Sequence, residues 1–242
     1  MYNQTVGGTH GYRIRRIGAN SPAYSVNSNH VYYPASALKT LQHFYAMSLV
    51  QAGTWDLNTT DIPNCIPLTA DPCDEFAFTL PNCTQGLDAS LQSMMVNSNN
   101  TSTIAIQDAV GQLIWPNHPQ VGTLGRSVIN TWATQNLGFN FTTLRTRFGC
   151  VGACGTNTNR FDLITNEKMY QKIAGNSILD ANHRVLMKDL MLNENNSNFI
   201  LNVINQEAND LDKASIINDF RDETYLIRKG GSWTCGGKRY IT

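Results

Sequence analysis

Hydrophobic positions near the start of the chain change from a period of two to a period of three and four. Residues 11–17 alternate apolar and charged side chains, as a half-buried strand does. The turn residues Asn20-Ser-Pro22 follow, and residues 23–33 can form a second strand. These segments predict an antiparallel hairpin. From Ser36 onward, apolar residues recur at three and four, which predicts an amphipathic helix that ends at Gly53.

A long helical middle follows, interrupted by two segments without periodicity. Residues 56–85 are rich in proline and cysteine and predict a stapled loop, and residues 138–159 predict an ordered surface loop. Near the end, residues 224–229 predict a strand, and residues 238–242 begin another. The expected helices span residues 87–96, 102–113, 123–137, 162–174 and 182–192, with further helix expected over 198–208 and 212–220.

The layout is therefore strands, a helical middle, and strands again. Strands from the two chain ends can pair into one antiparallel sheet packed against a helical lobe, so the expected class is α/β (α+β). Because the length suits one domain, we expect residues 1–242 to form a single unit. Its sheet lobe would hold residues 1–35 and 222–242, and its helical lobe residues 36–221. A cleft between the lobes is the expected ligand site.

Composition excludes two classes of partner. Lysine plus arginine number 18 and aspartate plus glutamate number 18, and this balance argues against nucleic acid, which requires a basic excess. No run of eighteen apolar residues occurs, so we expect no membrane span. Polarity comes mostly from asparagine, serine and threonine, which suits a secreted or periplasmic protein. No signal peptide is visible, as expected if an export signal was removed and a start methionine added.

Six cysteines support the same location. An even count favours disulfides and an oxidising compartment. The alternative is a zinc site at Cys150 and Cys154, but no histidine lies nearby to complete a tetrahedral set, so we expect no metal. A bridge within Cys65, Cys73 and Cys83 and another across the Cys150–Cys154 turn are favoured, with the connectivity left open.

Candidate chemistry begins where the first long helix starts. Pro34-Ala-Ser36-Ala-Leu-Lys39 would place Ser36 at a helix N-terminus, where free N–H groups favour a developing negative charge. Lys39 lies three residues on, on the same helical face, and a desolvated lysine can act as a base. The alternative is an ordinary N-cap serine followed by a surface lysine.

A second pair of polar residues lies on the turn before the next helix. Ser98 and Asn100 are two residues apart and can point into one cleft, where Ser98 would relay a proton and Asn100 would bind a substrate amide. The alternative is an asparagine-rich helix cap.

A third segment follows the late strand and reads Lys229-Gly230-Gly231-Ser232. Two glycines there permit close approach of a ligand, and a strand edge offers N–H and C=O groups to an extended substrate. The alternative is a simple transition from strand to turn.

The three segments together resemble a known superfamily. Their order, Ser-x-x-Lys, Ser-x-Asn and Lys-Gly-Gly, is similar to the motif set of serine β-lactamases and penicillin-binding proteins, the D-Ala-D-Ala peptidases. Residues 33–40 and 95–101 also resemble segments of class A β-lactamases. The resemblance covers residues 11–233 in order of elements and is specific only near the motifs.

The resemblance implies roles for these residues and no cofactor. Ser36 would attack a carbonyl and become acylated, with Lys39 as the base. Ser98, aided by Lys229, would carry the proton to the leaving nitrogen, and Asn100 would bind the substrate amide.

It also implies the substrate-binding strand. The backbone N–H groups of Ser36 and Ser232 would hold the oxyanion, beside Gly230 and Gly231. The substrate would be a β-lactam or a cell-wall peptide.

Three features depart from the family pattern. Gly230 replaces a threonine or serine whose hydroxyl helps to bind a substrate carboxylate. Class A enzymes carry a loop glutamate that activates water, whereas no Asp or Glu occurs from Ala109 to Phe161. Asp162 and Glu167 come next but are expected to be cap and surface residues. The chain also ends where a further strand would begin, so we expect either a fragment or a second chain that completes the sheet.

The sequence thus predicts a β-lactamase-like serine hydrolase that forms an acyl-enzyme on Ser36 and releases it slowly. A D-Ala-D-Ala carboxypeptidase or transpeptidase is the first alternative. A penicillin-recognising binding or sensor module that does not hydrolyse its ligand is the second. His43, seven residues after Ser36, is expected to face the interior.

Overall fold

The computed structural model describes residues 11–63, 83–140, 143–148, 158–175 and 177–192, and the backbone of 232–235 and 238–241. The expected helices over 198–208 and 212–220, and the expected strand over 224–229, lie outside these residues.

The helices of the middle region begin and end close to the predicted positions. The five helices expected between residues 87 and 192 are confirmed, each end within two residues of its prediction. The first helix differs, because a 3₁₀ turn, η1, precedes the α-helix. The elements are η1 (Ala35–Leu38), α2 (Lys39–Gln51), α3 (Leu87–Met95), α4 (Asn100–Ile114), α5 (Val121–Leu137), α6 (Leu163–Ala174) and α7 (Ala181–Leu192).

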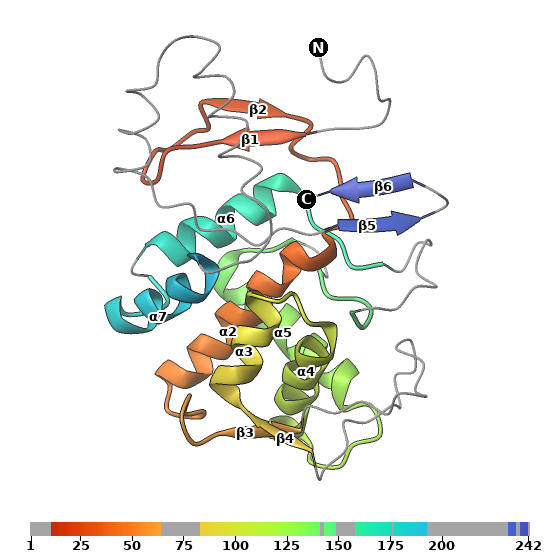
Figure 1. Ribbon diagram of the computed structural model, residues 1–242. Helices are drawn as coiled ribbons and strands as arrows, with labels where there is room; N and C mark the ends of the chain where they lie inside the picture. Colours follow the sequence, from red (N-terminus) through yellow and green to blue (C-terminus); the bar gives the residue numbers. More distant parts are fainter. Residues whose placement is uncertain are drawn as a thin grey trace.

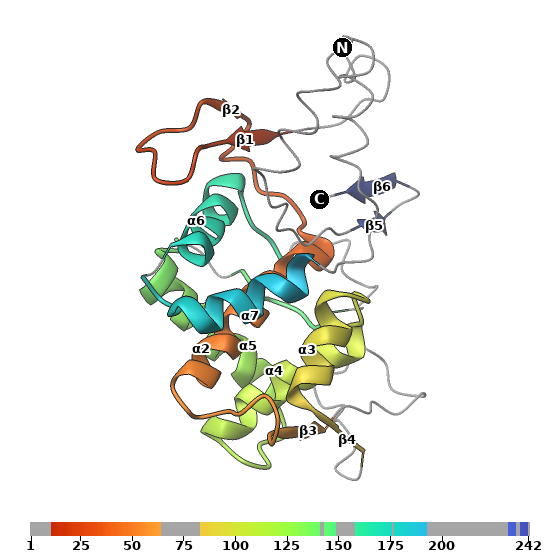
Figure 2. The ribbon, with the colours of Figure 1, turned by 60° about the vertical axis from the view of Figure 1, so that its left-hand side comes forward.

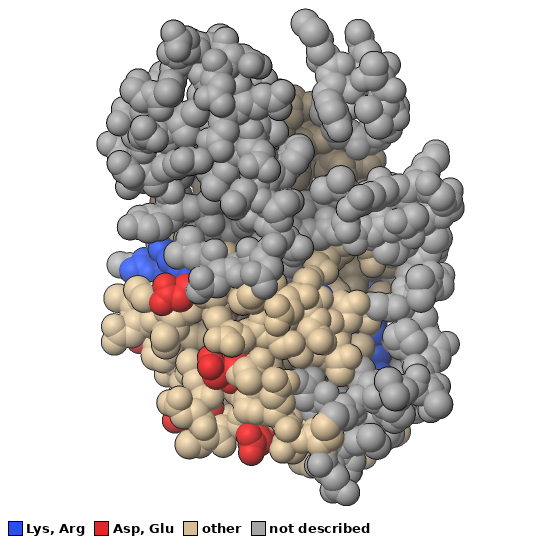
Figure 3. Space-filling view, viewed as in Figure 1, with Lys and Arg blue, Asp and Glu red and all other residues tan. Residues whose placement is uncertain are grey.

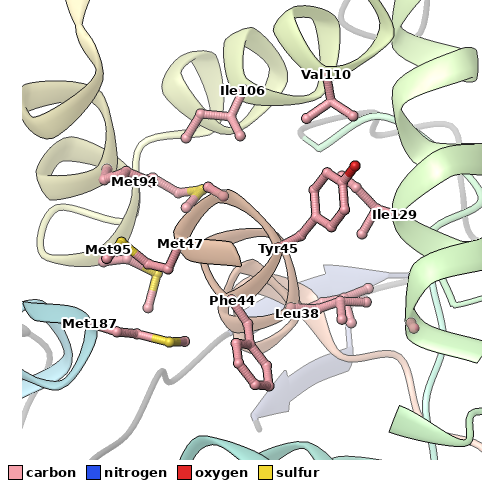
Figure 4. Packing of buried hydrophobic residues seen from close by; sticks show 14 of the residues in the cluster. Leu38, Phe44, Tyr45, Met47, Met94, Met95, Ile106, Val110, Ile129 and Met187 are labelled. Atoms are coloured by element: carbon pink, nitrogen blue, oxygen red, sulfur yellow. The ribbon is translucent and has the colours of Figure 1, made fainter. Parts of the chain in front are cut away.

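Helix α2 is the centre of the helical part. It contacts α3, α4, α5 and α7, which surround it in the two ribbon views (Figures 1 and 2). Side chains leave α2 on several sides, with Met47 directed toward Met94 and Met95 of α3 and Tyr45 toward Ile129 of α5 (Figure 4). Every residue from Lys39 to Met47 is buried. The prediction of an amphipathic helix is therefore wrong, because no face of this segment is left to solvent.

Helices α4 and α5 pack backbone against backbone. A Cβ atom on Gly111 would lie 1.9 Å from the carbonyl oxygen of Val121, and one on Gly125 would lie 1.8 Å from that of Gln107. Only glycine permits this approach. The contact fixes α4, whose first residue is Asn100, against the rest of the helical part.

Short antiparallel strand pairs come from both ends of the chain. Strand β1 (Tyr12–Ile14) pairs with β2 (Tyr24–Val26), which confirms the N-terminal hairpin, and β5 (Ser232–Cys235) pairs with β6 (Lys238–Ile241). The mixed α/β class is confirmed. The single sheet expected from both ends is not formed among the described residues, where the two pairs are separate ladders.

A third strand pair was not expected. Strand β3 (Asp61–Pro63) pairs with β4 (Thr84–Gly86) and closes the proline- and cysteine-rich segment at its base. Cys83, next to β4, is disulfide-bonded. The other five cysteines lie outside the residues whose side chains the structure describes.

The N-terminal hairpin is attached to α6 by charge. Arg13 lies in β1 and Arg15 directly follows it. Both donate to the carboxylate of Glu167, and the distance from Arg15 Nη1 to Glu167 Oε1 is 2.7 Å. Glu167 is therefore not the surface residue expected. Asp162 is the expected cap, because its Oδ1 accepts from the Thr165 N–H at 2.6 Å.

The expectation of a surface loop over 138–159 is wrong for the described residues 143–148. Thr143, Leu144, Arg147 and Phe148 are all buried between the helices. On the face seen in Figure 3, the described surface is mostly uncharged, and its acidic and basic side chains form small separate groups.

None of the described helices is both long enough and apolar enough to cross a bilayer. The described residues also contain no group of three or more His, Cys, Asp or Glu arranged to hold a metal ion.

Candidate active site

Ser36 lies in the short 3₁₀ turn that leads into α2. Pro34 precedes this turn and Ser36 is half-buried. In the first turn of such a helix the backbone N–H groups have no intrahelical partner and remain available to an anion. Ala35, immediately before Ser36, has φ of +45°, which is a left-handed conformation that alanine seldom adopts. Strained residues of this kind concentrate at functional sites, and each costs about 1–3 kcal/mol.

Lys39 is the first residue of α2 and is completely buried. Its Nζ donates to Ser98 O at 2.5 Å, to Ser98 Oγ at 3.2 Å and to Asn100 Oδ1 at 2.7 Å. An ammonium has three N–H donors, and burial of its charge requires that they be bonded. The alternative of a surface lysine is thereby excluded. Lys39 instead joins α2 to the turn between α3 and α4.

In the turn around Ser98, neighbouring residues have different roles: one caps helix α4 and the others bind Lys39. Asn99 is the N-cap of α4, because its Oδ1 accepts from the Ser102 N–H at 3.0 Å. The asparagine cap weighed from the sequence therefore exists, but it uses Asn99. Ser98 has φ of +56°, and this strained conformation directs both its carbonyl and its hydroxyl to Lys39. Asn100 is exposed apart from the oxygen that Lys39 holds.

Ser36 and Lys39 belong to the same turn of chain but are not hydrogen-bonded to each other in the described part of the protein. The lysine ammonium is directed to the Ser98 turn instead. Residues three apart in a helical turn start from the same face, so Ser36 and Lys39 share one side of the chain at this point.

An aromatic ring covers Lys39 from a third direction. The Nζ atom lies 5.5 Å from the ring centroid of Phe148, a cation–π distance. The sequence prediction did not include Phe148. In the local sequence Phe148 is a single aromatic residue between a polar residue and a glycine, and this pattern does not indicate that its ring lies over Lys39.

The third motif is described only in part. Lys229, Gly230 and Gly231 lie outside the described residues. Ser232 was expected to lie in a turn after the end of a strand, whereas it begins strand β5. Strand β5 lies against η1, so this strand and the turn that carries Ser36 are neighbours (Figure 1).

His43 is buried one turn after Lys39 in α2, which confirms that it faces the interior. Neither ring nitrogen has a hydrogen-bond partner, and burial lowers the pKa of His43 to about 3. The imidazole is therefore neutral near pH 7.

The arrangement of elements is similar to that of solved β-lactamases and of PBP-A. A β-lactamase from Burkholderia vietnamiensis is similar with a TM-score of 0.61 and 14% identity, over 80% of this chain and 66% of that one. A β-lactamase from Sphaerobacter thermophilus gives a TM-score of 0.60 and 17% identity, over 81% and 67%. A mutant of PBP-A, in an acyl-enzyme complex with penicillin G, is similar with a TM-score of 0.58 and 19% identity, over 76% of this chain and 62% of that one. The chain thus spans 62–67% of the length of these solved chains.

The amino-acid sequence itself also matches a family model. The family model described as "Beta-lactamase enzyme family" matches residues 2–233, nearly the whole chain. The protein therefore belongs to the beta-lactamase enzyme family. Comparison with curated protein sequences gives no significant match.

Proposed function

We propose that this protein forms an acyl-enzyme on Ser36 with a β-lactam or a related amide. The observation that carries the proposal is the buried Lys39, whose ammonium is bonded to Ser98 and Asn100 directly after the turn that holds Ser36. A buried lysine between two serines provides the groups for moving a proton.

The acylation step follows from these positions. The Ser36 oxygen bonds to the carbonyl carbon, and the bond from that carbon to the amide nitrogen breaks. The hydroxyl proton passes to Lys39 when its amine is neutral. Ser98, whose Oγ lies 3.2 Å from Lys39 Nζ, gives its hydroxyl proton to the departing nitrogen and receives the proton that Lys39 took from Ser36, so both residues return to their starting state. In a β-lactam the nitrogen stays attached through the opened ring, so the adduct retains the whole ligand.

Substrate binding uses the exposed side of the same residues. The oxygen of Asn100 accepts from Lys39, so its amide N–H groups are the part that donates to a substrate carbonyl. The N–H groups of Ser36 and Ser232 would hold the oxyanion, since β5 lies against η1. Lys229, with the Gly230-Gly231 backbone, would contribute charge and close approach to the ligand.

We further propose that hydrolysis of the acyl-enzyme is slow. Release requires a water molecule and a base beside the ester. Residues 109–161 contain no Asp or Glu, and the side chain that covers Lys39 is the apolar ring of Phe148. A D-Ala-D-Ala peptidase is the second candidate, favoured by the same absence of a loop carboxylate. Either substrate class places the protein outside the cytoplasm, in a secreted or periplasmic location.

The test is a time course of intact mass with a fluorescent penicillin. The proposal expects the mass to rise by that of the whole penicillin and to stay raised for many minutes. An adduct lost within seconds would support an efficient lactamase and overturn the slow release. If no adduct forms, release of D-Ala from a cell-wall pentapeptide decides whether the peptidase alternative replaces the β-lactam proposal.

A further inference from the structure

Residues 143–148, the segment that carries Phe148, are fixed to the helical part by a buried ion pair. Arg147 Nη2 donates to both carboxylate oxygens of Asp108 in α4, at 2.9 and 2.8 Å. Each side chain is 1% exposed. An ion pair this deeply buried strongly resists separation, because removal of one partner leaves a charge without compensation.

The start of the same segment is held by α5. The Oδ1 atom of Asn130 accepts from the N–H groups of Thr143 at 3.1 Å and Leu144 at 2.9 Å, and its Nδ2 donates to the Leu144 carbonyl at 2.8 Å. One side chain thus satisfies three backbone groups of the segment.

The middle of the segment is held by the chain just before α6. The Oδ1 atom of Asn159 accepts from the N–H groups of Arg145 at 2.7 Å and Thr146 at 2.9 Å. The Arg160 N–H donates to the Thr143 carbonyl at 3.1 Å. Residues 143–147 are therefore each tied to the core, which is unusual for a connection between helices.

We propose that Asp108 and Arg147 are positioning residues that hold Phe148 over Lys39 and thereby lengthen the life of the acyl-enzyme. This inference rests on the proposed acylation of Ser36. Arg147 is the chain neighbour of Phe148, and Asp108 lies on α4, the helix that also carries Asn100. The pair therefore ties the ring that covers the ammonium to the helix that binds it.

The physical effect is exclusion of water. A phenyl ring fixed over Nζ occupies the space in which Lys39 would activate a water molecule. The ring also keeps solvent away from the buried amine and from the ester. Release of the ring admits water to that space. Loss of the ion pair should thus accelerate hydrolysis of the acyl-enzyme. The acylation step should stay nearly unchanged, because Lys39 keeps its hydrogen bonds to Ser98 and Asn100.

The experiment compares acylation and release rates in Asp108→Asn, Phe148→Ala and the double variant. We expect Asp108→Asn to shorten the acyl lifetime by about tenfold or more, with less than about a threefold change in acylation rate. In the Phe148→Ala background, Asp108→Asn should have no further effect on release, because the ring it positions is gone. Equal effects of Asp108→Asn with and without Phe148 would overturn the proposal.

Two further variants keep the test decisive. If Asp108→Asn fails to fold, Asp108→Leu combined with Arg147→Met removes both charges and avoids an unpaired one. It should shorten the lifetime in the same way. Arg147→Lys keeps the positive charge opposite Asp108, so its acyl-enzyme should live longer than that of the variant without either charge, though less long than that of the wild type. The matched control is Glu167→Gln, which breaks the ion pairs of α6 with Arg13 and Arg15 and should leave release unchanged.

A readout without ligand separates this inference from the proposed function. Amide hydrogen exchange at residues 143–148 should be slow in the wild type and faster in Asp108→Asn. If the wild type forms no adduct, the proposed function fails whatever the exchange shows. If it forms an adduct whose lifetime is the same in Asp108→Asn, while exchange is faster, the positioning role alone fails.

Discussion

The side-chain oxygen of Asn100 accepts a hydrogen bond from Lys39 Nζ at 2.7 Å, across 61 positions of the sequence. This contact joins the first residue of α2 to the first residue of α4. It makes the position of the ammonium depend on the turn between α3 and α4 rather than on α2 alone. Substitution of the two residues that bind the ammonium, Ser98 and Asn100, should therefore affect acylation before it affects folding.

Asn100→Ala removes one acceptor of the Lys39 ammonium and the amide proposed to bind substrate. We expect the second-order rate of acylation by a fluorescent penicillin to fall by about 100-fold, the size expected when a reacting group is displaced. Asn99→Ala is the matched control. It removes the N-cap of α4 and should lower the free energy of unfolding by about 1 kcal/mol with little change in acylation. Equal losses of acylation in both variants would contradict the distinct role of Asn100.

Phe148→Glu places a carboxylate where the aromatic ring now covers Lys39. A general base beside the ester should accelerate release of the acyl group by about 100-fold relative to Phe148→Gln. Glutamine has nearly the same size as glutamate but its amide cannot act as a base. The measurement is the decay of the intact-mass adduct after excess penicillin is removed. Equal decay rates in the two variants would show that this position does not face the ester.

Buried His43 should make the protein less stable in acid. Burial lowers its pKa from 6.5 to about 3, so below pH 6.5 the unfolded chain binds a proton that the folded protein does not. The free energy of unfolding should then fall as the pH is lowered from 6.5 toward 3, by up to about 1.4 kcal/mol per pH unit from this residue. Above pH 6.5 the residue is neutral in both states and has no such effect.

His43→Met is the comparison for this pH dependence. It fills a similar volume without a titratable group and also removes two buried ring nitrogens that lack partners. Urea unfolding at several pH values should show a shallower loss of stability in His43→Met than in the wild type between pH 6.5 and 4. Identical slopes would mean that His43 does not titrate as its burial implies.

Gly111→Ala should disrupt the contact between α4 and α5. The new Cβ would lie 1.9 Å from the carbonyl oxygen of Val121, so the helices must separate. We expect a loss of about 2–3 kcal/mol in the free energy of unfolding. Gly86→Ala is the control, because its Cβ would meet only Asp61 Oδ1 at 3.9 Å, and it should change stability by less than about 0.5 kcal/mol. Similar thermal midpoints for the two variants would contradict the close packing of the helices.

Local periodicity predicted the helices well because their apolar positions recur over twelve or more residues in most cases. It failed at α2, where Lys39 and Gln42 are buried by surrounding helices that the local pattern does not describe. It also failed at residues 143–148. The partners that bury this segment, Asp108 and Asn130, lie 39 and 13–14 positions away in the sequence, and nothing near the segment indicates them.

The sequence proposed a set of site residues but not their geometry. The motif order directed attention to Ser36, Lys39, Ser98 and Asn100, and the structure brings the last three into hydrogen-bonding distance. Spacing alone did not separate the capping role of Asn99 from the lysine contact of Asn100. Nor did it reveal Phe148, which reaches the site only through the fold of the 143–148 segment.

Acylation of Ser36 is the central claim, and peptide mapping after reaction with penicillin tests it most directly. Trypsin should release residues 17–39, between Arg16 and Lys39, as one peptide. We expect this peptide to carry the mass of one whole penicillin, with fragment ions that place it on Ser36, and we expect Ser36→Ala to carry none. An adduct on any other residue, or an equal adduct in Ser36→Ala, would contradict the account.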